Sequence, residues 1–205
     1  MRLIKVAAVA AALSLPLAGA AYAKLDIPSG TYLLDPNHAS LHWKVDHLGL
    51  SKYTARFTEM KAVLELDSDD PTKSKITATI YPASLRTDYP NADVKDFDKK
   101  LQEEKEFFDA TQFPEITFTS TKLTETGPNS GTMEGELTFL GVTKPVTLDV
   151  VMNGSLVKHP FVDAAAIGFS ATGSLKRSEF GMTHLIPGVG DEVEIVIEAE
   201  FVEKK

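Results

Sequence analysis

Two neighbouring segments between Gly131 and Asn153 alternate apolar and polar residues with a period of two. This period places one set of side chains on the dry face of a β-sheet and the other set in water. The link Leu140–Pro145 contains a glycine, which suits a turn between antiparallel strands. The pattern therefore predicts a β-hairpin. The side chains assigned to its dry face are Met133, Gly135, Leu137, Phe139, Val146, Leu148, Val150 and Met152.

Similar alternation recurs along most of the chain, and only one segment has helical spacing. Val94, Phe97 and Leu101 lie at i, i+3 and i+7 among charged residues, which predicts a helix near residues 91–109. The sequence indicates an all-β fold of about eight antiparallel strands with this helix inserted, arranged as a sandwich or as a closed barrel. The other strands are expected at 32–34, 41–45, 53–66 (with a change of register near 58–59), 76–80, 116–121, 165–175 and 193–201.

The N-terminus resembles a secretory signal peptide. Arg2 and Lys5 form a charged start, Val6–Leu17 is apolar, and Ala21-Tyr22-Ala23 fits the cleavage site. We expect residues 1–23 to be removed on export and residues 24–205 to form a single domain. No later segment is apolar over enough residues to span a membrane.

Charge and cysteine content exclude several classes of function. The formal net charge is −8, and loss of Arg2 and Lys5 would make the rest more negative, which disfavours binding to nucleic acid or to an anionic lipid surface by charge. The chain has no cysteine, so disulfides, thiolate metal sites and a catalytic cysteine are all excluded. Stability must therefore come from the core.

The expected inner face mixes large aromatic residues with unusually small ones. Phenylalanines are expected there at 57, 118, 139 and 169, yet a barrel filled by its own side chains needs bulk at most inward positions. Small residues on several strands could leave a dry hollow for a long apolar ligand, or could simply fit tapering corners. The pattern alone leaves both interpretations open. The small residues are Ala78, Ser120, Gly135, Ala171, Gly173 and Ala199.

Four stretches resemble the YceI-like polyisoprenoid-binding proteins: Leu34–Ser51, Phe107–Thr121, Gly135–Val150 and Gly168–Met182. The resemblance implies an extended, eight-stranded, lipocalin-like barrel in the periplasm. It also implies a hydrophobic tunnel that binds a polyisoprenoid lipid, such as an isoprenoid quinone, as ligand rather than as cofactor. The run Asp98–Glu103 departs from the family pattern because it lacks the histidine and the arginine usual there.

We expect a binding or carrier protein with neither a catalytic site nor a metal site. A lipid-acting hydrolase or isomerase that uses His47 or His184 as base is the alternative, and an envelope protein with a collapsed cavity is a third option. The loop 177–190 is either a flap over the opening or an ordinary crossover stabilised by a pair of Arg177 and Glu179, and a homodimer is a further option. The expected ligand-binding residues are Trp43, His47, Phe57, Phe107, Phe108, Phe118, Leu137, Phe139, Phe169, Phe180, Met182 and Ile197.

Overall fold

A computed structural model describes residues 24–205, so the expected signal peptide at 1–23 lies outside the described residues. Within the described part, α1 (Phe97–Glu103) is the only α-helix, accompanied by the short 3-10 turns η1 (Pro71–Lys73), η2 (Pro82–Ser84) and η3 (Arg177–Phe180). The strands are β1 (Gly30–His47), β2 (Ser51–Phe57), β3 (Met60–Leu66), β4 (Lys75–Ile80), β5 (Leu85–Arg86), β6 (Ile116–Gly127), β7 (Ser130–Phe139), β8 (Val142–Leu156), β9 (Ala166–Lys176) and β10 (Val189–Glu203).

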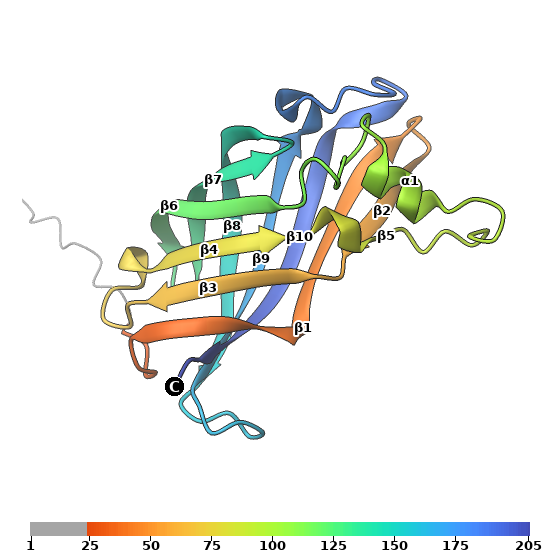
Figure 1. The fold of residues 1–205 in the computed structure, drawn as a ribbon. Coiled ribbons are helices and arrows are strands. Elements are labelled where there is room, and N and C mark those ends of the chain that lie inside the picture. The colour runs from red at the N-terminus through yellow and green to blue at the C-terminus, as the bar shows by residue number, and fades with distance from the viewer. Residues whose placement is uncertain (1–23) are drawn as a thin grey trace, which may run out of the picture.

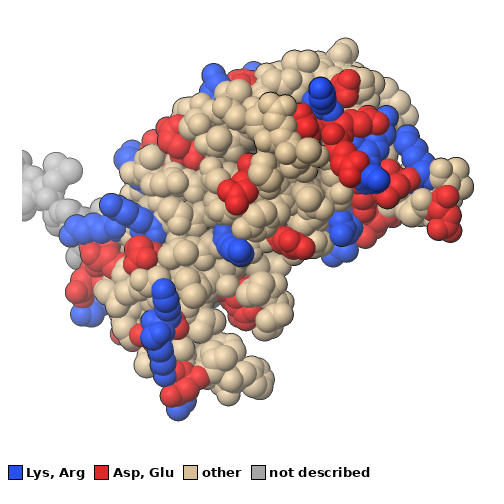
Figure 2. All heavy atoms as spheres, viewed as in Figure 1, with Lys and Arg blue, Asp and Glu red and all other residues tan. Residues whose placement is uncertain are grey.

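Eight of these strands form a closed antiparallel barrel (Figure 1). The order around the barrel is β1-β3-β4-β6-β7-β8-β9-β10, and β10 pairs with β1 to close the ring. The structure confirms the predicted barrel and excludes the sandwich. The remaining strands, β2 and β5, extend the sheet outward from the second half of β1. Acidic and basic side chains are scattered over the exterior (Figure 2).

The change of register expected near residues 58–59 is a complete break between β2 and β3. Both strands pair with β1, β2 with its second half and β3 with its first residues. The buried side chain of Ser84 meets the backbone at the break, since its Oγ accepts hydrogen bonds from Thr58 N (3.2 Å) and Glu59 N (3.0 Å). A buried hydroxyl thus replaces the hydrogen bonds that the strand loses at the bend.

The two strands expected at 32–34 and 41–45 are one long strand, so that prediction was wrong. Asp35 accepts a hydrogen bond from Asn37 N (2.9 Å) and pairs with His38 Nδ1 (2.8 Å). These local bonds bend β1, and its register against β10 shifts between Leu34 and Ala39. The turn-forming residues therefore make a bulge inside a strand, not a chain reversal. The sharp bend is visible in Figure 1.

The helix is much shorter than the predicted 91–109. Its first residue follows Asp96, whose side chain caps the helix by accepting a hydrogen bond from Lys99 N (2.9 Å). Val94 is 88% exposed and does not join the apolar face that predicted the longer helix. After Glu103 the backbone becomes extended, and Phe107 and Phe108 lie in a turn.

Buried side chains form three clusters, one near each end of the barrel and one between them. Phe57, Leu101 and Phe139 belong to the cluster beneath α1, and Tyr32, Leu64 and Phe201 belong to the cluster at the opposite end. Phe118, Met133 and Leu148 form the middle cluster. None of the helices in residues 24–205 is long and apolar enough to cross a bilayer.

Candidate ligand-binding cavity

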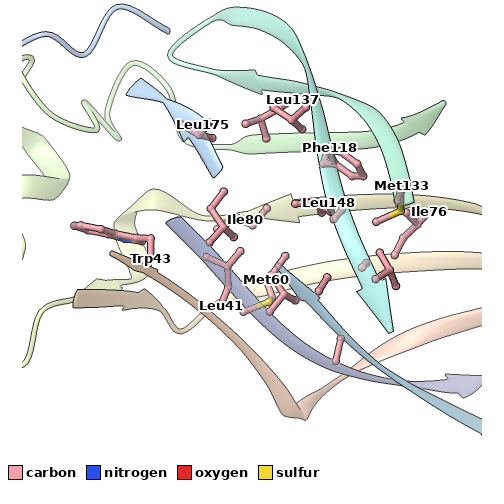
Figure 3. A pocket seen from close by; sticks show the side chains of 18 of the residues that line it. Leu41, Trp43, Met60, Ile76, Ile80, Phe118, Met133, Leu137, Leu148 and Leu175 are labelled. Atoms are coloured by element: carbon pink, nitrogen blue, oxygen red, sulfur yellow. The ribbon is translucent and has the colours of Figure 1, made fainter. Parts of the chain in front are cut away.

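A cavity of about 700 Å³ runs through the barrel. Its volume is in the range of cavities that hold small-molecule ligands. The wall is almost entirely apolar and is supplied by strands from all around the ring. Figure 3 shows side chains from several strands pointing into this shared space. Those labelled are Leu41, Trp43, Met60, Ile76, Ile80, Phe118, Met133, Leu137, Leu148 and Leu175.

The inward side chains of β10 show that the barrel does not fill its own interior. Val193, Ile195, Ile197 and Ala199 all line the cavity, yet none of them is fully buried. In a close-packed core such residues would lose nearly all of their accessible surface. Their remaining surface faces the hollow, so it is apolar area that a ligand could cover.

An aromatic group lies at the α1 end of the cavity. The ring of Phe108 lies 6.2 Å from Trp43, 5.4 Å from Phe57 and 5.6 Å from Phe139, measured between centroids. Trp43 also packs against Tyr53 at 6.5 Å. The segment after α1 thus places one aromatic ring against Trp43 and Phe139 of the barrel and against Phe57 of β2. This group narrows the end of the cavity without closing it.

At the opposite end the cavity reaches a gap between β4 and β6. These strands pair over only four residue pairs, from Thr77 with Thr119 to Ile80 with Ile116. A hydrogen bond from Ile76 N to Ser120 Oγ (2.9 Å) bridges the point where they separate. Beyond it, residues 71, 72, 74 and 75 on one side and 123–125 and 127–132 on the other contribute to the cavity wall. The cavity therefore extends along most of the barrel and suits a long ligand.

The loop 177–190 is fixed by the guanidinium of Arg177. Its Nε donates to the carbonyl of Gly190 (2.8 Å), its Nη1 to those of Met182 (3.1 Å) and His184 (2.9 Å), and its Nη2 to that of Val189 (2.9 Å). The side chain is only 5% exposed, and this burial lowers the pKa of Arg177. The loop is therefore held by an arginine bound to backbone carbonyls and not by the Arg–Glu pair considered from the sequence.

Eleven of the twelve expected ligand-binding residues lie in the cavity wall. The exception is Phe180, which is 2% exposed and packs behind Phe139 with ring centroids 5.7 Å apart. It belongs to η3, outside the strands, where the period of two that located residues such as Phe118 and Leu137 does not apply. Phe180 is therefore a core residue. Those in the wall are Trp43, His47, Phe57, Phe107, Phe108, Phe118, Leu137, Phe139, Phe169, Met182 and Ile197.

The small inward residues divide into two groups. Ala78, Ala171 and Ala199 line the cavity, which agrees with the first of the two interpretations that the pattern left open. Gly135 and Gly173 do not line it, because the ring of Phe118 covers the first and the side chain of Leu148 covers the second. Any Cβ at these glycines would collide with those side chains. Ser120 is likewise absent from the wall, and its hydroxyl accepts the hydrogen bond from Ile76 N.

The list of expected residues omitted many aliphatic side chains of the wall. Ile195 on β10 and Val146, Val150 and Met152 on β8 line the cavity. The alternation had already placed the β8 residues on the dry face, but the selection favoured aromatic residues. The signal that could have found them is therefore the alternation itself. Met60 and Ile76, on two adjacent strands, were missed for the same reason.

Both histidines of the enzyme alternative lie at the cavity wall near the α1 end. The ring of His184 meets that of Phe107 edge to face at 5.3 Å. Among residues 24–205, neither His47 nor His184 makes a side-chain hydrogen bond to a carboxylate that would orient it as a base. The same residues contain no group of three His, Asp or Glu side chains arranged to hold a metal ion.

Comparison with known proteins gives consistent matches over the barrel. The YceI-like domain matches residues 32–201. Protein YceI of Salmonella arizonae is 32% identical over 168 residues, which cover 82% of this chain and 83% of that protein. The crystal structure of the Campylobacter jejuni YCEI protein has a TM-score of 0.68 at 31% identity, and the match covers 79% of this chain and 91% of that one.

A more distant match shows the same fold. The structure of a polyisoprenoid binding domain from Saccharophagus degradans has a TM-score of 0.58 at 12% identity and covers 86% of this chain and 100% of that one. At this identity the likeness extends to the fold alone.

Proposed function

Because this chain belongs to the YceI-like domain family, we propose that it is a binding or carrier protein that holds the hydrocarbon tail of a polyisoprenoid lipid inside its barrel. The proposal rests above all on the apolar cavity of about 700 Å³, whose wall includes half-buried residues of β10 from Val193 to Ala199. The polyisoprenoid-binding title of the Saccharophagus degradans domain supports the same ligand class.

The binding free energy would come from burial of the tail. Each CH₂ group removed from water contributes about 0.8 kcal/mol, which amounts to about 4 kcal/mol per five-carbon isoprene unit. Part of this gain is lost in ordering the flexible tail and in immobilising the ligand. A tail of several units that fills the cavity would still bind tightly, whereas a single unit would not.

We propose an isoprenoid quinone as the specific ligand and the periplasm as the location. The signal-peptide pattern of residues 1–23 supports export. A quinone combines a long prenyl tail with a compact ring, and the aromatic group around Phe108 at the α1 end offers ring faces and edges against which a flat head group can pack. The tail would then extend toward the gap between β4 and β6.

The single tryptophan provides a direct test. Trp43 lies in the cavity wall, and quinone rings quench tryptophan fluorescence on close approach. Titration with a long-chain ubiquinone should quench the emission in a saturable way, whereas a quinone with no prenyl tail should quench weakly and without saturation. Equal quenching by the two quinones would contradict the proposal. A prenyl alcohol that competes with the quinone would show that the tail, and not the ring, is recognised.

A further inference from the structure

An exposed apolar tip lies beside the α1 end of the cavity. It consists of Leu48 and Leu50 in the β1–β2 turn and of Leu185 and Ile186 in the loop before β10. The two loops are joined by a hydrogen bond from Leu48 N to the carbonyl of Gly188 (2.8 Å). The tip is therefore a single surface feature built from two parts of the chain that are far apart in sequence.

The four apolar side chains of the tip contribute little to the stability of the fold, because they remain largely exposed. Leu48 is 61% exposed, Leu50 83%, Leu185 54% and Ile186 36%. Leu48 and Leu185 also adopt left-handed backbone conformations, with φ of 59° and 64°, which a glycine or an asparagine adopts more readily. Leu140 shares this conformation but packs against the core, whereas the two tip leucines remain largely in water. Strain combined with exposure indicates a role outside the fold.

The tip also differs in charge from the rest of the molecule. The chain contains 29 acidic residues, and none occurs in 47–52 or in 180–190; the flanking carboxylates of Asp46 and Asp191 accept hydrogen bonds from Gly49 N (2.8 Å) and Ser178 N (2.9 Å). The loop 177–190 is held in place by Arg177, so the apolar side chains are presented on a fixed backbone. In Figure 2 the upper right edge of the molecule is largely tan, and the acidic and basic side chains gather over α1 below it.

The tip is continuous with the cavity. His47, His184 and Leu185 are exposed and line the cavity as well, so the hollow reaches the surface where the tip projects. A second exposed apolar loop, which contains Val157 and Phe161, lies between β8 and β9 and contributes nothing to the cavity wall. Exposure alone therefore does not single out the tip; its position at the opening does.

We propose that this apolar tip docks the opening of the cavity onto the uncharged surface of a lipid bilayer, where the ligand tail passes between membrane and barrel without crossing water. The four tip side chains carry no charge, so they can partition into the head-group region by hydrophobic burial, and the carboxylate of Asp46 beside them is turned to the backbone of the same turn, where it accepts a hydrogen bond from Gly49 N (2.8 Å). The inference rests on the proposed function, because contact between the tip and a bilayer is useful only if the ligand is a lipid that is dissolved in the membrane.

The experiment compares two matched double variants of the full chain. Leu48→Asn with Leu50→Ser removes two exposed leucines of the tip that do not line the cavity, and asparagine suits the backbone at position 48. Val157→Ser with Phe161→Ser removes exposed apolar side chains from the other loop. Each protein is floated with phosphatidylcholine vesicles, and ubiquinone uptake from detergent micelles is followed separately by quenching of Trp43.

We expect wild-type protein and the Val157/Phe161 variant to float with the vesicles. The Leu48/Leu50 variant should show at least about a tenfold lower partition coefficient, with unchanged uptake from micelles. Absence of flotation by the wild type, or equal flotation of both variants, would overturn the proposal. A wild-type dimer that the Leu48/Leu50 change converts to a monomer without altering flotation would assign the tip to a second copy of the chain. Failure of uptake from micelles would instead count against the proposed function.

Discussion

The ring of Phe108 meets the ring of Phe57 edge to face, with centroids 5.4 Å apart and an interplanar angle of 87°. Phe57 ends β2, whereas Phe108 lies in the connection between α1 and β6. This contact joins the irregular segment after the helix to β2, the strand that extends the sheet from the second half of β1. Together with the contacts of Phe108 to Trp43 and Phe139, it holds that segment over the α1 end of the cavity.

Replacement of Phe108 by alanine should loosen this end of the cavity. Phe→Ala changes in cores cost about 3–5 kcal/mol, and because Phe108 is only half-buried we expect a loss of about 3 kcal/mol in the free energy of unfolding. Urea denaturation measures the loss, and stopped-flow displacement of ubiquinone should show faster dissociation. The change Phe161→Ala, at a phenylalanine that is 89% exposed, should alter stability by less than about 0.5 kcal/mol. Similar losses for both variants would mean that the contact has no special role.

A larger side chain at Ala78 should block the cavity without harming the fold. Ala78 is half-buried, lies on β4 and faces the hollow near the middle cluster. The change Ala78→Phe should weaken ubiquinone binding at least about tenfold, because the new ring would occupy volume needed by the tail. Its matched control is Thr77→Phe on the exposed face of the same strand, which should leave binding unchanged. Unaltered affinity of the Ala78→Phe protein would show that the ligand lies elsewhere.

Removal of the Arg177 guanidinium should release the loop 177–190. The change Arg177→Met leaves four carbonyl groups without their donor, and we expect a loss of at least about 3 kcal/mol in stability. Hydrogen exchange should accelerate mainly in residues 181–190. The neighbouring change Lys176→Met, at an exposed position, should do neither. Exchange that accelerates uniformly across the barrel would indicate that Arg177 stabilises the whole fold and not this loop.

The pair of Asp35 and His38 should make stability depend weakly on pH. A hydrogen bond to Asp35 raises the pKa of His38 above its ordinary 6.5, and the same bond lowers the pKa of Asp35 below 3.8. The His38 contribution is fully present below pH 6.5 and is lost as the pH rises through the raised value; the Asp35 contribution is present above pH 3.8 and is lost in acid.

Unfolding of the wild type and of His38→Asn should therefore differ most between about pH 4 and 6.5, and the two stabilities should converge toward pH 9. Denaturant titrations at pH 5 and pH 9 measure both differences. A stability difference that is larger at pH 9 than at pH 5 would show that the histidine acts at the bend of β1 in its neutral form.

The sequence predicts the strands of the barrel well because the alternation of apolar and polar residues can be read within each strand by itself. Alternation with a period of two reports directly which side of a strand each residue faces, and this located the wall residues on β7 and β8. The same rule does not reach the segments outside the strands. Phe180 was assigned to the cavity from its place in the loop 177–190, and the helix was made too long because the spacing of Val94, Phe97 and Leu101 does not show that Asp96 caps it. Whether a small inward residue lines the cavity or is covered by another side chain depends on the residues of the adjacent strands.

Gly135 and Ala78 illustrate this limit. Both were assigned to the inner face, but Gly135 lies beneath the ring of Phe118 on the adjacent strand, while Ala78 opens onto the hollow. The pairing of β6 with β7 and the rotamer of Phe118 decide whether such a residue is covered or lines the cavity. Neither can be inferred from the sequence of one strand. The hydrogen bonds that Arg177 donates to the loop 177–190 could not be predicted either. Their acceptors are backbone carbonyls, which every residue has and which therefore carry no sequence signal.

The most direct measurement of the central claim is mass spectrometry of an organic-solvent extract of the full chain, expressed in a bacterial host and purified from its periplasm without detergent. A barrel with an unfilled apolar cavity of about 700 Å³ should carry a prenyl lipid at close to one molecule per protein. The Ala78→Phe variant, purified in parallel, should carry much less. An extract free of prenyl lipid, from a protein that also fails to take up added ubiquinone, would contradict the account.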